Sequence, residues 1–204
     1  MRSARLPALL AVATLGLVAV SARATQDPPE GMSPEAMAQA MAQSMELARP
    51  GPEHELLARY AGDWTLEASI TMTPGSQPLT ETGTARMHTI LGGRFLQIDV
   101  EGGFMGTPYE SMTLLGFDRR YDDWTLLAFD TYGTYYVTAK GKHGEDGVVR
   151  MDGREEDLMG PQVYTFVVEF VSDDELVVAT DFTALAGQTF DEPFRMVTVR
   201  YKRK

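Results

Sequence analysis

The sequence predicts a mainly β protein, an antiparallel up-and-down β-barrel of about ten strands preceded by an N-terminal helical segment. From residue 64 onward, strand-like runs alternate with turn-forming residues at intervals of roughly ten residues, which is typical of an antiparallel meander. The connections are all short, so strands that are neighbours in the sequence should pair. Closure into a barrel would remove exposed sheet edges. An open, strongly curved half-barrel is the alternative.

The first 24 residues are typical of a secretory signal peptide. Arg2 and Arg5 precede an uncharged apolar run over residues 6–20, and residues 22–24 (ARA) place small residues at the cleavage positions. This run is shorter than the ~20 residues that a membrane-spanning helix needs, which argues against an uncleaved anchor. We therefore expect export to the periplasm or the extracellular space, and no stable insertion into a membrane.

Two helices are expected before the first strand. Ser33 can cap a helix whose first position is a proline, and this helix should run to about Ala48, because residues 49–52 (RPGP) stop it. A shorter helix should follow over residues 53–60, with Gly62 ending it.

The chain thus divides into a signal peptide (1–24), a flexible leader with a helix (25–50) and a β-barrel domain (51–204). The strands are expected near residues 64–73, 79–90, 94–102, 109–118, 123–130, 133–142, 147–155, 162–171, 175–183 and 193–203.

Composition excludes several kinds of chemistry. The chain contains no cysteine, so disulfides, thiol nucleophiles, zinc–thiolate sites and iron–sulfur clusters are ruled out. Removing residues 1–24 takes three arginines and no acid from the totals of 18 and 29, which leaves 15 basic and 29 acidic side chains and a net charge of −14. Because such a chain repels polyanions, we expect no nucleic-acid partner.

Several segments together resemble the bacterial domain-of-unknown-function 1579 family. They are GPEHELLARYAGDW (51–64), LGGRFLQIDVEGGFMGTPYE (91–110), LLGFDRRYDDW (114–124), FDTYGT (129–134) and VTVRYKRK (197–204). The resemblance implies a calycin-like β-barrel, similar to lipocalins, and implies no particular reaction.

Residues 62–64 (GDW) are similar to the lipocalin Gly-x-Trp, in which the tryptophan plugs one end of the barrel. Small haem-binding barrels of the nitrobindin type carry a glycine-rich first strand and a histidine near the C-terminus. Here residues 65–73 (TLEASITMT) contain no glycine, and the last histidine, His143, falls in a turn. We therefore expect no haem and no other cofactor.

Residues 94–101 (RFLQIDVE) raise the question of which face points inward. Asp99 and Glu101 share a face, with α-carbons roughly 6.5–7 Å apart, and paired carboxylates can act on sugars. A solvated outer face explains the same alternation more simply. We therefore expect Leu96, Ile98 and Val100 inside the barrel and both carboxylates outside.

Arg94 and Asp130 are the charged candidates for ligand binding. Arg94 shares the inward parity at the start of its strand and could hold a carboxylate or phosphate through its planar guanidinium. Asp130 follows Trp124, Leu126 and Ala128 on an apolar face, where an acid needs a partner. We hypothesise that Arg94 is that partner. The alternatives are that Arg94 pairs with another acid or lies in solvent, and that Asp130 belongs to the following turn.

Aromatic side chains supply the other candidates. Tyr109, Tyr132 and Tyr135 could line the rim of a cavity, offering flat apolar surface and hydroxyl groups. The alternative is that they are ordinary strand aromatics, which are common. Trp64 would close one end of the barrel.

No pattern indicates a metal site or a catalytic motif. Met37, Met41 and Met45 form a stripe that could bind copper(I), but no histidine or cysteine lies nearby, and a soft apolar surface covering the barrel mouth or docking a partner is the simpler explanation. The three histidines match no zinc spacing, and no nucleophile elbow or phosphate loop occurs.

The function predicted is therefore that of an exported barrel that holds a small apolar or amphipathic molecule. The predicted ligand-binding residues are Trp64, Arg94, Tyr109, Asp130, Tyr132 and Tyr135. Two alternatives stay open: an enzyme, such as an isomerase or hydrolase, that uses the same cavity, and a protein-interaction module whose barrel is filled by its own side chains. The sequence does not identify the ligand or the oligomeric state.

Overall fold

The computed structural model describes residues 32–204, so the predicted signal peptide and most of the leader lie outside the described residues. The chain divides into two compact units, one ending at Met41 and one comprising Ala42–Lys204. The second unit contains the whole barrel.

Both expected helices are present, as α1 (Pro34–Leu47) and α2 (Pro52–Arg59). The hydroxyl of Ser33 accepts a hydrogen bond from the Ala36 amide at 3.2 Å, which satisfies one free donor at the start of α1. No residue of α1 is buried, and Met41 and Met45 of the methionine stripe are exposed.

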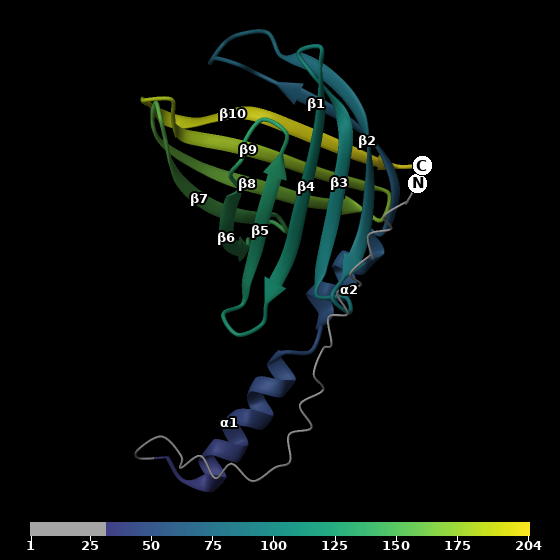
Figure 1. The fold of residues 1–204 in the computed structure, drawn as a ribbon, viewed down its shortest axis with the longest axis vertical. Helices are drawn as coiled ribbons and strands as arrows, with labels where there is room; N and C mark the ends of the chain where they lie inside the picture. Colours follow the sequence, from purple (N-terminus) through teal and green to yellow (C-terminus); the bar gives the residue numbers. More distant parts are fainter. Residues whose placement is uncertain (1–31) are drawn as a thin grey trace, which may run out of the picture. The chain divides into compact units, whose positions relative to one another are not determined.

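Ten strands follow, as the alternation predicted (Figure 1). They are β1 (Gly62–Ile70), β2 (Leu79–Ile90), β3 (Phe95–Phe104), β4 (Thr107–Asp118), β5 (Asp123–Asp130), β6 (Val137–His143), β7 (Val149–Asp157), β8 (Gly160–Ser172), β9 (Glu175–Leu185) and β10 (Gln188–Arg203). Two boundaries differ appreciably from those expected: β6 begins four residues late, at Val137 instead of residue 133, and β10 begins five residues early, at Gln188 instead of residue 193.

The strands form a closed, antiparallel, up-and-down barrel. Each strand pairs with its neighbour in the sequence, and β10 returns to pair with β1, from Trp64 opposite Arg203 to Ile70 opposite Val197. The predicted barrel is therefore confirmed and the open half-barrel is excluded. Register shifts between Thr189 and Phe194 show that the early part of β10 pairs irregularly with β9, as a β-bulge does.

The side-chain alternation of β3 follows the prediction. Leu96, Ile98 and Val100 are buried in the core, whereas Glu101 is exposed and Asp99 is half-buried on the outer face. Asp99 accepts a hydrogen bond from the Gln97 side chain at 2.8 Å, so its carboxylate is engaged outside the barrel.

Helix α2 lies at one end of the barrel, which we call the closed end (Figure 1). Aromatic side chains fill the core there. The ring of Tyr60 stacks on Trp64 at 5.9 Å and contacts Phe170 at 5.2 Å, and Phe170 in turn contacts Trp124 at 5.4 Å. Trp64 is fully buried, and its indole nitrogen donates to the Tyr60 carbonyl at 3.0 Å. The guanidinium of Arg203 lies 4.5 Å from the centre of the indole ring, a cation–π contact.

Among residues 32–204, no helix has both the length and the apolar character needed to cross a bilayer.

Candidate functional site

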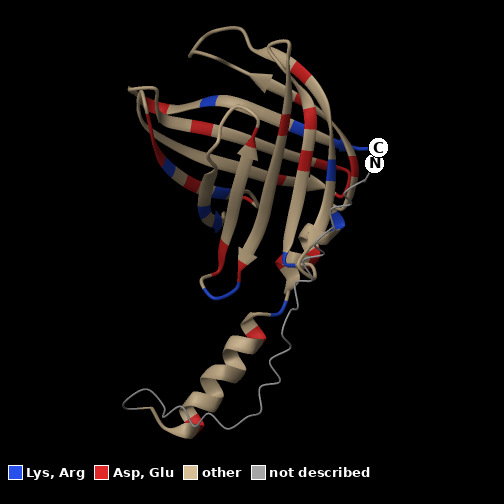
Figure 2. Cartoon of the chain, in the orientation of Figure 1, with Lys and Arg blue, Asp and Glu red and all other residues tan. Residues whose placement is uncertain are grey.

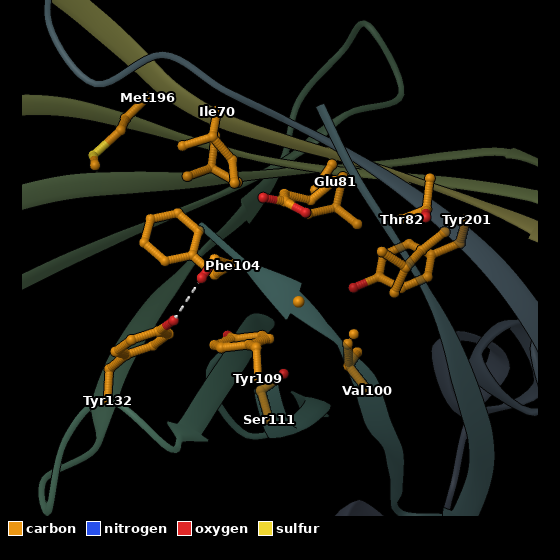
Figure 3. Close-up of a pocket in the computed structure, with 16 residues that line it drawn as sticks. Ile70, Glu81, Thr82, Val100, Phe104, Tyr109, Ser111, Tyr132, Met196 and Tyr201 are labelled. Carbon is orange, nitrogen blue, oxygen red and sulfur yellow. Dashed lines mark hydrogen bonds between the residues drawn. The ribbon is translucent and has the colours of Figure 1, made fainter. Parts of the chain in front are cut away.

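A cavity of about 240 Å³ lies toward the opposite end of the barrel, which we call the open end (Figure 3). Its walls come from β1, β2, β3, β4 and β10, together with Tyr132 from the β5–β6 loop. Most of the lining is apolar or aromatic. Aliphatic side chains line it at Leu66, Ala68, Ile70, Val100, Met196, Val197 and Val199, and aromatic ones at Phe104, Tyr109, Tyr132 and Tyr201.

The cavity exists because small residues occupy inward or rim positions at this height of the barrel. Ala68, Gly102, Gly103 and Ser111 all line it. A Cβ atom added at Gly103 would meet nothing closer than 3.8 Å, so the chain leaves open space there. The same strands carry larger side chains, such as Met87 and Leu96, toward the closed end, where the core is filled.

Glu81, near the start of β2, is the only charged residue among residues 32–204 that lines the cavity. Its Oε1 atom accepts a hydrogen bond from the Met105 amide in the β3–β4 turn at 3.0 Å. This bond holds the side chain beside the cavity, where Figure 3 shows it between Ile70 and Thr82.

Tyr201 of β10 places a hydroxyl group against the same space. The residue is 7% exposed, and its hydroxyl points into the cavity (Figure 3). Burial raises the pKa of this hydroxyl well above its usual value, and the neighbouring Tyr109 adds to the effect. The group therefore stays protonated and can both donate and accept a hydrogen bond.

Three aromatic side chains, Phe104, Tyr109 and Tyr132, form a cluster on one side of the cavity (Figure 3). Tyr132 stacks on Tyr109 at 5.7 Å and meets Phe104 edge-on at 5.4 Å. The Tyr132 hydroxyl donates to the Phe104 carbonyl at 3.2 Å, which ties the β5–β6 loop to the end of β3. Burial raises the pKa of Tyr109, so its hydroxyl is also neutral.

Two of the six predicted ligand-binding residues, Tyr109 and Tyr132, line this cavity. Trp64 does not, because it lies at the closed end, packed against Tyr60. Tyr135 is 61% exposed in the β5–β6 loop and does not line the cavity either, since residues 133–136, where a strand was expected to begin, belong to that loop.

The hypothesised ion pair between Arg94 and Asp130 is wrong. Arg94 lies before β3, near the closed end, where its guanidinium donates to the carbonyls of Leu91 at 3.0 Å and Ala48 at 2.9 Å. Asp130 ends β5 near the opposite end and accepts a hydrogen bond from the Tyr132 amide at 2.8 Å. The alternative that Asp130 belongs to the following turn is therefore correct, and Arg94 instead binds one carbonyl of its own β2–β3 turn and one just after α1.

Sequence reasoning missed Glu81 and Tyr201. The strand of Glu81 is polar on both faces, so its parity could not be read from hydrophobicity. Tyr201 continues the parity of Val197 and Val199, and that alternation was a usable signal for an inward tyrosine.

The histidines form no metal site. His54 is buried at the closed end, and within residues 32–204 no group of three His, Cys, Asp or Glu side chains is arranged to hold an ion.

A closed ten-stranded antiparallel barrel, plugged at one end and hollow near the other, defines a lipocalin-like barrel protein. The chain belongs to the DUF1579 family of proteins of unknown function, whose sequence profile matches residues 49–203.

Solved structures resemble the chain in fold alone. Rv2717c from M. tuberculosis is 15% identical, with a TM-score of 0.54, over 76% of this chain and 99% of that one. A de novo designed fluorescence-activating β-barrel is 14% identical over 72% of this chain and 96% of its own, and its TM-score of 0.38 is too low to support an argument. No curated protein matches the sequence.

Proposed function

We propose that this protein binds a small apolar or amphipathic molecule in the cavity at the open end of the barrel. The observation that carries the proposal is the cavity itself, about 240 Å³ lined mainly by aliphatic and aromatic side chains. Known ligand pockets range over about 300–1,000 Å³, so the occupant would be small. Burial of its apolar surface would drive binding, at roughly 25 cal/mol per Å² removed from water.

Two polar groups would orient the ligand. Glu81 and the Tyr201 hydroxyl take the role that the sequence suggested for Arg94 and Asp130, because they line the cavity and the other two do not. A barrel filled by its own side chains would have favoured an interaction module, and the cavity argues against that alternative.

We also propose that the protein acts outside the cytoplasm, because residues 1–24 have the composition of a signal peptide. N-terminal sequencing of the protein from the periplasm or culture medium should find a chain that begins near Thr25. A chain that stays in the cytoplasm with residues 1–24 intact would contradict this.

The binding proposal is tested by filling the cavity. Ala68→Phe places a large ring among the lining residues, whereas Ser69→Phe places the same ring on the outer face one residue later. Native mass spectrometry should detect a small molecule bound to the parent and to Ser69→Phe, from the expression host or from an added lipid extract, and little or none bound to Ala68→Phe. Equal occupancy of both variants, or no uptake by the parent, would contradict the proposal.

A further inference from the structure

Acidic and basic side chains are distributed unequally between the two ends of the barrel (Figure 2). At the open end, the C-terminal ends of β5 and β7 carry Asp130, Glu155 and Asp157. Burial raises the pKa of Tyr135 in the neighbouring loop, and the negative charges of these three carboxylates raise it further.

The basic residues lie elsewhere or are already paired. All four lysines lie on β6 or at the end of β10. Both strands begin at the open end and run toward the closed end, so the lysines of β10 lie at the closed end and those of β6 lie from its midpoint onward. Arg154 and Arg195, the arginines of β7 and β10 nearest the open end, bind Glu156 at 2.9 Å and Asp181 at 2.7 Å. A ligand that enters at the open end therefore meets a negative electrostatic potential. The described cavity wall contains no basic side chain that would offset this potential.

Inside the cavity, the carboxylate of Glu81 lies across from the rings of Tyr109 and Tyr132, and the Phe104 ring lies between them (Figure 3). The face of an aromatic ring carries negative charge and attracts a cation. A carboxylate facing aromatic rings favours an organic cation over a neutral or anionic group.

The Tyr201 hydroxyl adds an independent polar group. The residue is buried and lines the cavity, and its hydroxyl points into the cavity, where it can accept a hydrogen bond from a ligand (Figure 3). A ligand that carries an N–H group would bind it, because the phenol oxygen can accept that hydrogen.

We propose that the cavity selects an amphipathic amine, held with its ammonium group between Glu81 and the aromatic cluster and its apolar chain against Leu66, Ile70 and Val199. This inference rests on the proposed binding function and specifies its ligand class. An amphiphile with a carboxylate head, such as a fatty acid, would be rejected because the cavity wall offers it Glu81 and no arginine or lysine.

Three probes of the same length separate these possibilities: hexylamine, hexan-1-ol and hexanoate, titrated calorimetrically into the protein, purified without residues 1–24, at pH 7. Hexylamine should bind at least ten-fold more tightly than hexan-1-ol, and hexanoate more weakly than either. If the three bind equally, or hexanoate binds best, the amine inference is wrong while the binding function stands. If none of them binds, both fail.

Variants identify the groups responsible. Glu81→Gln should weaken hexylamine binding at least ten-fold and leave hexan-1-ol within two-fold, whereas Glu101→Gln, the same change on the outer face of β3, should alter neither. Tyr201→Phe should weaken hexylamine binding and leave the thermal midpoint close to that of the parent, because it removes only the hydroxyl that faces the ligand and keeps the ring. Unchanged hexylamine affinity in Glu81→Gln would overturn the assignment.

Discussion

His54 is a buried titratable side chain at the closed end. Its Nδ1 atom accepts a hydrogen bond from the Gly51 amide at 3.0 Å at the start of α2, an interaction that requires this nitrogen to be unprotonated. Burial is the main cause that lowers the pKa of His54 below 6.5, and the negative charge of Glu53 opposes it. The folded protein therefore contains the neutral imidazole.

This lowered pKa predicts a loss of stability in mild acid. Below pH 6.5 the unfolded chain binds a proton at His54, whereas the folded chain does not until the pH reaches its lower folded pKa. The free energy of unfolding should therefore fall as the pH drops from 6.5 through that folded pKa. Above pH 6.5 the stability that neutral His54 contributes should be fully present. Urea unfolding at pH 7.5 and 5.5 measures this. His54→Gln should reduce the difference between the two pH values, and His143→Gln, at an exposed position, should not.

Trp64 offers a second prediction at this scale. Trp64→Phe removes the indole N–H and leaves the Tyr60 carbonyl without that donor in a buried site. The cost should be about 1–3 kcal/mol of unfolding free energy. Because Trp64 does not line the cavity, ligand uptake by the folded variant should match the parent, and a selective loss of uptake would show that this residue does contribute to binding.

At the scale of elements, α2 is the piece that closes the barrel. The side chain of Leu57, on the inner side of this helix, is fully buried, and the helix contacts β2, β3 and β4. Arg119, in the β4–β5 turn, donates to the carbonyls of Glu46 and Arg49 at 2.7 and 2.9 Å, so the chain leading into α2 is also held.

Packing of α2 should therefore contribute measurably to stability. Leu57→Ala should lower the free energy of unfolding by about 2–5 kcal/mol, since it leaves a cavity in a filled core. Glu55→Ala, on the exposed side of the same helix, should change it by less than about 0.5 kcal/mol. Similar small effects of both substitutions in urea titrations would mean that α2 packs loosely.

At the scale of the whole molecule, pairing of β1 with β10 leaves the barrel without a free edge. The amide groups of β1 and β10 should therefore exchange with deuterium as slowly as those of β3 and β4, which have two neighbours in any arrangement. Peptide-level exchange mass spectrometry over residues 64–70 and 197–203 measures this. Rapid exchange in both segments would indicate an open half-barrel.

Sequence reasoning predicted the architecture for physical reasons that act locally. Side chains alternate between the two faces of a strand, so the apolar parity of Leu96, Ile98 and Val100 identifies the core face without a structure. Turn-forming residues mark where each strand ends, and short connections leave neighbouring strands little choice except to pair. The β5–β6 region was the local exception, because Tyr135 and Tyr136 have strand-forming side chains but lie in a loop after the Asp130 turn.

The site was less predictable, because parity says which way a residue points and not how far along the barrel it lies. Arg94 and Asp130 were expected to share the inward face, but they lie toward opposite ends of the barrel. Glu81 and Tyr201 are 120 positions apart in the sequence, yet they line one cavity. The sequence by itself determined a ten-stranded barrel with its core face. Only the tertiary structure decided which end is plugged, where small residues leave a cavity, and which polar groups face it, since these depend on strand stagger and closure across the whole sheet.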